Sequence, residues 1–158
     1  MKNINENTTA YEAAIKLISK RDMSEFTLRA SLEKAGYRGN EIEPAIQKLI
    51  EQKLIDDLKS AKRIIELHSS AERGRLTFAR LLASKGFKHE VVEAALEPLD
   101  HKQQVESATR LKQRLKGRYA GKPARETKVK LSQALRRRGF DWEIITQVID
   151  SDTWDGEE

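Results

Sequence analysis

The residues of this sequence that could do chemistry are mostly arginines and lysines, crowded into one stretch. From Arg110 to Arg138, twelve basic side chains stand against a single acid, Glu126, which gives the stretch a charge of +11. A dense cluster of bases is typical of a surface that binds a polyanion. The twelve are Arg110, Lys112, Arg114, Lys116, Arg118, Lys122, Arg125, Lys128, Lys130, Arg136, Arg137 and Arg138.

The three consecutive arginines at 136–138 stand directly before Gly139. Cations in the last turn of a helix interact favourably with its dipole, and this explains one arginine better than three. Because arginine binds phosphate and carboxylate groups bidentately, we expect such contacts here. The alternative is a solvated helix face, but such a face usually mixes both signs of charge, since like charges at i,i+4 repel. Arg73, Arg75 and Arg80 would extend the basic surface toward the middle of the chain.

Two aromatic residues lie among or beside these bases. Tyr119 continues an apolar stripe formed by Leu111 and Leu115, so it either packs in a core or stacks on an unpaired base. Trp142 follows Asp141 at the start of a helix, where packing against the preceding helix is the expected role and base stacking is the alternative. Trp154 lies in an acidic tail that we expect to be disordered.

Composition argues against several other classes of function. The 158 residues include no cysteine, and the three histidines have no ligand spacing, so neither a thiol nucleophile nor a metal site is expected, and no cofactor. The sequence has no phosphate-binding glycine loop and no nucleophile elbow, so we do not expect an enzyme. Asp56 and Asp57 resemble a carboxylate pair, but acids at a helix start suit capping better. Without a membrane-spanning run or a secretory signal, a soluble cytoplasmic protein is the simplest expectation.

The elements that position these residues are predicted to be helices throughout, because apolar residues recur at intervals of three and four positions along the sequence. Three glycines, Gly36, Gly86 and Gly139, mark an internal repeat with spacings of 50 and 53 residues. An aromatic residue follows each glycine, and apolar residues stand eight and four positions before it and six and ten positions after it. The aromatic residues are Tyr37, Phe87 and Phe140, and the residues four positions before the glycines are Leu32, Leu82 and Leu135.

Each glycine is predicted to end a helix in the left-handed conformation, where glycine has no Cβ penalty, with the next residue packing back on the leucine. Upstream of each such pair of helices, one more amphipathic helix is expected, at about 11–20, 58–67 and 105–115. Predicted helix starts are Thr9 with Glu12, Asn40 with Glu43, Ser69 with Glu72, Pro123, and Asp141.

The predicted fold is therefore all-α, an elongated array of three tandem three-helix repeats with about nine helices. The repeats cover residues 9–56, 57–100 and 101–150, and the third is the basic one. Flexible ends are expected at 1–8 and 151–158, the latter acidic.

The order of these units resembles the RecX family of bacterial recombination regulators. The resemblance covers about residues 10–150 and includes the Leu54-Ile55-Asp56-Asp57 junction and the basic run that ends at Gly139-Phe140. It implies a monomeric modulator of the RecA recombinase, which binds in the groove of the RecA–single-stranded DNA filament and inhibits strand exchange and ATP hydrolysis. It implies no catalytic residue, and it assigns filament contacts only as a class, to the bases of the second and third repeats.

Two other functions remain open from the residues themselves. Each three-helix unit could serve as a helix-turn-helix module that reads duplex DNA, or the repeats could form a protein-interaction scaffold to which DNA is irrelevant. Under the RecA hypothesis, binding to single-stranded DNA alone should be weak and steeply dependent on salt. An extended body that bridges neighbouring RecA subunits should act at well below one copy per RecA.

Overall fold

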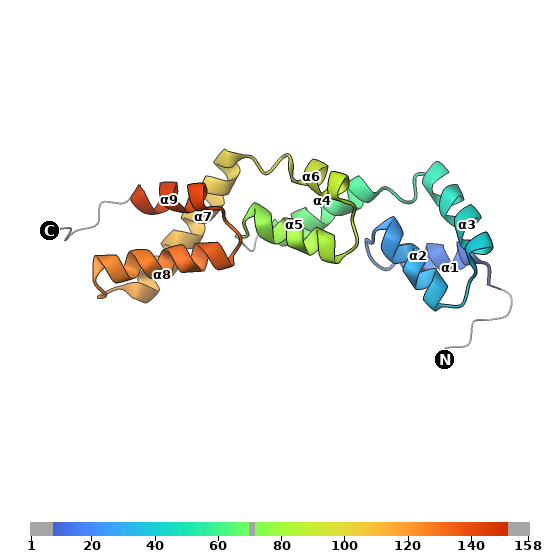
Figure 1. The fold of residues 1–158 in the computed structure, drawn as a ribbon, viewed down its shortest axis with the longest axis horizontal. Coiled ribbons are helices and arrows are strands. Elements are labelled where there is room, and N and C mark those ends of the chain that lie inside the picture. Colours follow the sequence, from blue (N-terminus) through green and yellow to red (C-terminus); the bar gives the residue numbers. More distant parts are fainter. Residues whose placement is uncertain (1–7, 70–71, 152–158) are drawn as a thin grey trace. The chain divides into compact units, whose positions relative to one another are not determined.

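A computed structural model describes residues 8–69 and 72–151, and within them it contains nine α-helices and no strand (Figure 1). The predicted flexible ends and Trp154 lie wholly or largely outside these residues. We number the helices in successive groups of three along the chain, and contacts tie together the three helices of the first group and the three of the third. The helices are α1 (Ala10–Ile18), α2 (Glu25–Lys34), α3 (Gly39–Glu51), α4 (Asp57–His68), α5 (Arg75–Ser84), α6 (His89–Leu96), α7 (His101–Lys116), α8 (Ala124–Arg137) and α9 (Trp142–Asp150), with a 3₁₀ turn, η2 (Gly117–Tyr119), after α7.

The second helix of each group ends at a left-handed glycine, as predicted. Gly36, Gly86 and Gly139 have φ values of +97°, +77° and +84°. The amide of the following aromatic residue donates to the carbonyl five residues back at 3.2–3.3 Å, from Tyr37 to Leu32 and likewise from Phe87 and Phe140. These are the hydrogen bonds of a Schellman motif, which close the helix by using carbonyls that have no intrahelical donor.

The residues at the repeated spacings form the cores of the first and third groups. In the first, Leu28, Leu32, Ile42 and Ile46 are at most 1% exposed and pack with α1 through Ala14. In the third, the corresponding leucines and isoleucines of α8 and α9 pack against α7 around a fully buried aromatic ring. That ring belongs to Phe140, and its neighbours include Leu131, Leu135, Ile145 and Ile149. The spacing thus predicted which helix faces are buried.

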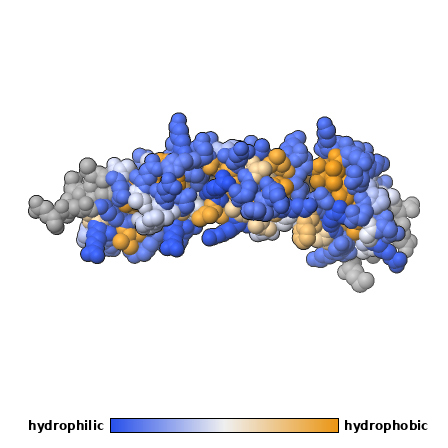
Figure 2. Space-filling model, turned by 45° about the horizontal axis from the view of Figure 1, so that its top comes forward, coloured by the Kyte–Doolittle hydropathy of each residue, from blue (hydrophilic) through white to orange (hydrophobic). Residues whose placement is uncertain are grey.

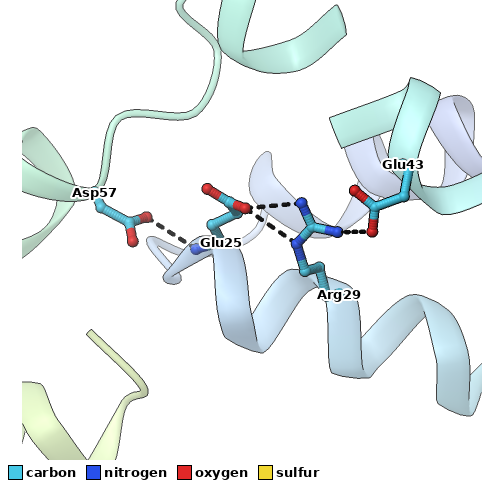
Figure 3. Close-up of polar contacts among 4 residues, drawn as sticks. All are labelled: Glu25, Arg29, Glu43 and Asp57. Carbon is cyan, nitrogen blue, oxygen red and sulfur yellow. Dashed lines mark hydrogen bonds and ion pairs between the residues drawn. The ribbon is translucent and has the colours of Figure 1, made fainter. Parts of the chain in front are cut away.

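A polar network ties α2 to α3 and to the start of α4 (Figure 3). The Arg29 guanidinium donates to Glu25, one turn earlier on α2, at 2.9 Å, and also pairs with Glu43 on α3. The backbone amide of Glu25 donates to the Asp57 carboxylate at 2.8 Å. Burial raises the pKa of Asp57, although this hydrogen bond opposes the shift. Asp57 therefore caps α2 across space, whereas Asp56 caps its own helix α4 by accepting from Lys59 at 2.9 Å.

Helix starts were predicted less well than helix ends. Thr9 with Glu12 forms the expected capping box and Asp141 caps α9, accepting from Ile144 at 3.0 Å. Three other predictions are wrong. The Ser69 hydroxyl donates back to Glu66 of α4 instead of capping α5. The box expected at Asn40 and Glu43 lies two residues earlier, where Glu41 accepts from the Arg38 amide, because α3 begins at Gly39 and Asn40 therefore lies inside it. Pro123 precedes α8 as its N-cap residue rather than being its first residue.

The contacts divide the chain into two compact units that do not follow the repeat boundaries. One unit comprises Met1–Ile65 with Leu82–Ala95, and the other comprises Glu66–Leu81 with Leu96–Glu158. Helix α5 contributes its last residues to the first unit and its earlier residues to the second. The boundaries of the repeats at 56 and 100 therefore remain a prediction.

The second helix of each group, α2, α5 or α8, is called its middle helix. Within each unit, the start of one middle helix is hydrogen-bonded to the end of the next. In the second unit, the carbonyl of Arg138 at the end of α8 accepts from the Gly74 amide and from the Thr77 hydroxyl of α5, both at 2.8 Å. In the first unit, the carbonyl of Lys85 at the end of α5 accepts from the hydroxyls of Ser24 and Thr27 at 2.7 Å. Carbonyls and donors that lack intrahelical partners thus satisfy one another at both junctions.

Candidate nucleic-acid interface

Most of the predicted basic residues of the third group present their side chains to solvent. Arg136, Arg137 and Arg138 are all exposed, at the last turn and C-cap of α8. They stand there because the apolar stripe of α8 ends at Leu135, one residue before them. The other exposed members are Arg80, Arg110, Arg114, Lys116, Arg118, Lys122, Arg125 and Lys130, whereas Arg73, Arg75 and Lys128 are partly buried. The surface drawn in Figure 2 is mostly hydrophilic, with hydrophobic side chains in separate small areas.

Lys112 is a correction to the predicted basic surface, because its side chain is only 3% exposed. Its ammonium group donates to the carbonyl of Val148, in the last turn of α9, at 2.8 Å, and lies 3.3 Å from the Ser151 hydroxyl. A cation at this position satisfies a C-terminal carbonyl and favours the helix dipole. Lys112 therefore holds α7 against α9 and does not take part in a surface.

Arg75 is also committed to internal contacts. Its guanidinium donates to the carbonyl of Leu96 at the end of α6 at 2.7 Å, and its backbone amide donates to Gln104 of α7 at 2.7 Å. Arg114 pairs with Glu72, and Lys122 pairs with Glu126 one turn later. These three bases have partners within the chain. The candidate interface is centred on the adjacent, exposed arginines around the end of α8.

The two aromatic candidates have opposite environments. Tyr119, in η2, is partly buried and packs against the core of α7, α8 and α9, which is the packing alternative of its prediction. Trp142 is 72% exposed, so the expectation that it packs against the preceding helix is wrong. The reason lies in α9, which buries Ile144, Ile145, Val148 and Ile149 and leaves its first residue outside this stripe.

A pocket of about 460 Å³ brings three predicted residues together at the α5–α8 junction. Arg80 comes from α5, Arg136 from the last turn of α8 and Trp142 from the first turn of α9. The remaining lining residues, none of them among the predicted binding residues, are Leu76, Gly139, Phe140, Asp141 and Ile145. The pocket thus combines two cations and one carboxylate with apolar walls.

The internal repeat gives a signal for this juxtaposition, because the donors and acceptors of the two junctions stand at equivalent positions of the repeat. Thr27 and Thr77 lie 50 residues apart and donate to Lys85 and Arg138, which lie 53 residues apart. Each partner is the residue directly before the capping glycine. Aligning the repeats shows which residues are equivalent, but only the structure shows that the start of one middle helix meets the end of the next.

Other kinds of site are not found in the described residues. Within residues 8–69 and 72–151, no three His, Cys, Asp or Glu side chains gather as ligands for a metal ion. None of the helices there has the length and apolar character that a membrane span requires.

Comparison with known proteins relates the first and third groups of helices to described domains. Residues 10–49 match the first three-helix domain of RecX, and residues 102–149 match its third three-helix domain. The exposed arginines before Gly139 and the pocket residues Arg136, Asp141 and Trp142 fall within the second of these matches.

Similar proteins cover nearly the whole chain. The regulatory protein RecX of Chlorobium limicola is 33% identical over 137 residues, which are 86% of this chain and 84% of that protein. The one from Vibrio vulnificus is 33% identical over 138 residues, 85% of this chain and 86% of the relative. The crystal structure of RecX from Lactobacillus salivarius superimposes with a TM-score of 0.85 at 26% identity, covering 90% of this chain and 93% of that one.

Proposed function

We propose that this chain, which belongs to the RecX family of regulatory proteins, binds the RecA–single-stranded DNA filament and inhibits RecA. Family membership rests on the matched first and third domains and on the relatives at 33% identity. The partner and the direction of regulation are what the family resemblance implies. On this proposal the chain acts as a monomer without a cofactor and binds single-stranded DNA only weakly by itself.

The observation that carries the proposal is the exposure of the arginines at the end of α8. Interaction with the helix dipole at the C-terminus accounts for one arginine better than for three. All three adjacent arginines are exposed to solvent here. The carbonyl of Arg138 accepts at the junction with α5, and the side chains of Arg136 and Arg137 are exposed beside it. Their guanidinium groups are therefore in place for phosphates of DNA or carboxylates of a protein partner.

Binding to three targets tests the proposal directly. Fluorescence anisotropy of the labelled full-length chain is measured with RecA filaments on single-stranded DNA, with the same DNA alone and with duplex DNA. The expected order of affinity is filament first, followed by a weak and salt-dependent binding to naked single strands. Preferential binding to duplex DNA of particular sequence would instead support the helix-turn-helix alternative, and binding to neither DNA nor filament would refute the proposal.

Stoichiometry separates two ways of inhibiting. A protein that acts within the filament, by blocking growth or bridging subunits, needs far fewer copies than there are RecA molecules. A protein that sequesters free RecA needs at least an equal number of copies. We propose the former mode, and a titration of inhibition against the ratio of the two proteins distinguishes them.

A further inference from the structure

The pocket at the α5–α8 junction has features that the junction itself does not require. The chain contains an internal comparison, because the equivalent junction between α2 and α5 uses the same threonine hydroxyl and the same carbonyl. Residues lining the pocket from α5 correspond to residues 50 positions earlier, and those from the end of α8 and the start of α9 correspond to residues 53 positions earlier.

The two junctions differ in the side chains that surround these shared bonds. Where the second junction has Arg80 and Arg136, the first has Ala30 and Ala83. Where the second has Trp142, the first has His89. Since the first junction forms with alanines at both places, neither arginine is needed to join one middle helix to the next. Their presence at the second junction therefore needs another reason, and a ligand is the reason that the exposed pocket suggests.

Each part of the pocket matches one part of a nucleotide. Trp142 is 72% exposed and Leu76 is 45% exposed, so an indole ring and an apolar side chain are available to hold a flat ring. The exposed guanidinium groups of Arg80 and Arg136 suit phosphate oxygens. Asp141 uses one carboxylate oxygen to cap α9, and its remaining acceptor capacity suits the exocyclic amine of a base.

We propose that this pocket binds one unpaired nucleotide of single-stranded DNA, with its base stacked on Trp142 and its flanking phosphates held by Arg80 and Arg136. The inference rests on the proposed function, and it assigns the DNA contact to a defined place. An acidic peptide would also pair with the two arginines, but it would bring its carboxylates toward Asp141. Its acidic residues carry no ring that could stack on Trp142, whereas every nucleotide carries a base. A nucleotide whose base has an amino group, such as deoxycytidylate, can make all three contacts: its ring with the indole, its phosphates with the arginines and its amine with the carboxylate.

The test uses Trp142 as its own reporter. In the Trp154→Phe background, Trp142 is the single tryptophan of the full-length chain. A short oligodeoxycytidylate should quench its fluorescence by stacking, whereas an abasic oligomer with the same number of phosphates should not. Equal quenching by both oligomers would show that the indole senses phosphate charge alone, and no quenching by either would show that the pocket does not take DNA. Either result would overturn the proposal.

Variants separate the base contact from the phosphate contacts. Trp142→Ala should weaken oligodeoxycytidylate binding by about 5- to 150-fold, which corresponds to about 1–3 kcal/mol for one stacked base. It should leave the salt dependence unchanged. The double variant Arg80→Ala, Arg136→Ala should lower the slope of log affinity against log salt by about 1.4, since single strands contribute about 0.7 per phosphate contact. His89→Ala, at the position equivalent to Trp142, is the matched control and should change neither quantity.

Failure of this proposal and failure of the proposed function give different results. If the wild type inhibits RecA while Trp142→Ala binds oligodeoxycytidylate as tightly as wild type does, the nucleotide site is refuted and the regulatory function stands. If Trp142 is quenched by oligodeoxycytidylate and not by the abasic oligomer, the site is supported even where RecA is unaffected. Quenching by polyglutamate with none by DNA would assign the pocket to an acidic peptide and overturn the proposal.

Discussion

Gly139 has two separate reasons to be glycine. Its φ of +84° penalises any side chain, and a Cβ added to it would meet the Thr77 hydroxyl at 2.3 Å and the Thr77 amide at 2.5 Å. Gly121 has a similar φ of +85° but open space around its Cβ position. This pair therefore separates the conformational cost of a side chain from the steric cost of crowding the junction.

Gly139→Ala should destabilise the fold considerably more than Gly121→Ala. The conformational cost is about 1–2 kcal/mol at either position, and the clash with Thr77 should add about 1–3 kcal/mol at Gly139 alone. Urea denaturation of both variants measures the difference in the free energy of unfolding. Equal losses at the two positions would show that α8 does not approach α5 as closely as the structure has it.

Lys112 is a structural cation in a segment whose other bases are mostly exposed. Lys112→Met should lower the free energy of unfolding by about 1–3 kcal/mol, because the carbonyl of Val148 loses its charged donor and keeps only the hydroxyl of Ser151 at 2.9 Å. The same change should leave the salt dependence of DNA binding as it is, since the ammonium group is buried. Thermal denaturation and a salt titration check the two halves of this prediction. A reduced salt slope would mean that Lys112 reaches phosphate.

At the scale of the helices, the junctions between successive middle helices depend on the same pair of groups. Thr77 and Thr27 each donate a hydroxyl hydrogen to the carbonyl that precedes a capping glycine, at 2.8 and 2.7 Å. Thr77→Val and Thr27→Val keep the side-chain shape and remove the hydroxyl, which at Thr27 also accepts from the Ser24 hydroxyl at 3.0 Å. Each should cost about 0.5–1.5 kcal/mol of stability, and the two losses should be similar, as measured by thermal denaturation. A loss at one junction only would indicate that the two joints are built differently.

How much of each element could be predicted follows from the kind of interaction that defines it. Helix ends and buried faces depend on local spacing, so the glycine at 86 with Leu82 and Phe87 identified a C-cap and its packing without any structure. Helix starts depend on competition between donors and acceptors that are distant in sequence. Glu43 satisfies the local pattern of a capping box, yet Arg29 of another helix engages it instead.

The candidate site shows the same limit. Arginine clusters are visible in the sequence, and Arg80, Arg136 and Trp142 could all be selected by type. Their convergence on one pocket depends on the meeting of α5 with α8, which is a contact over about 60 residues of chain, as in the Thr77–Arg138 hydrogen bond. Burial of Lys112 likewise depends on the position of α9, because its acceptor Val148 lies 36 residues away.

At the scale of the whole molecule, the division into units affects how the third repeat can be tested. Residues 66–81 belong to the same compact unit as residues 96–158. A truncation after Asp100 would therefore remove the hydrogen-bonding partners of Gly74 and Thr77 as well as the basic segment. Loss of activity in such a truncation could come from damage to α5, so removal of charge from the full-length chain is the better experiment.

Replacing Arg136, Arg137 and Arg138 by alanine should weaken the salt dependence of binding to single-stranded DNA. If all three contact phosphates, the slope of log affinity against log salt falls by about 2. The matched control replaces by alanine three lysines that are exposed on or next to helices of the first group, namely Lys16, Lys20 and Lys34. This change removes the same amount of positive charge. Circular dichroism verifies that both variants keep their helices. An equal change of slope in the two would show that only net charge matters.

The most direct test of the account is the rate of ATP hydrolysis by RecA on single-stranded DNA during titration with the full-length chain and these two triple variants. The wild type and the lysine variant should inhibit hydrolysis at well below one copy per RecA. The arginine variant, with its helices intact, should inhibit poorly or not at all. A RecA rate that stays constant at every ratio of wild-type chain would contradict the regulatory function, and full inhibition by the arginine variant would contradict the assignment of the contact to the end of α8.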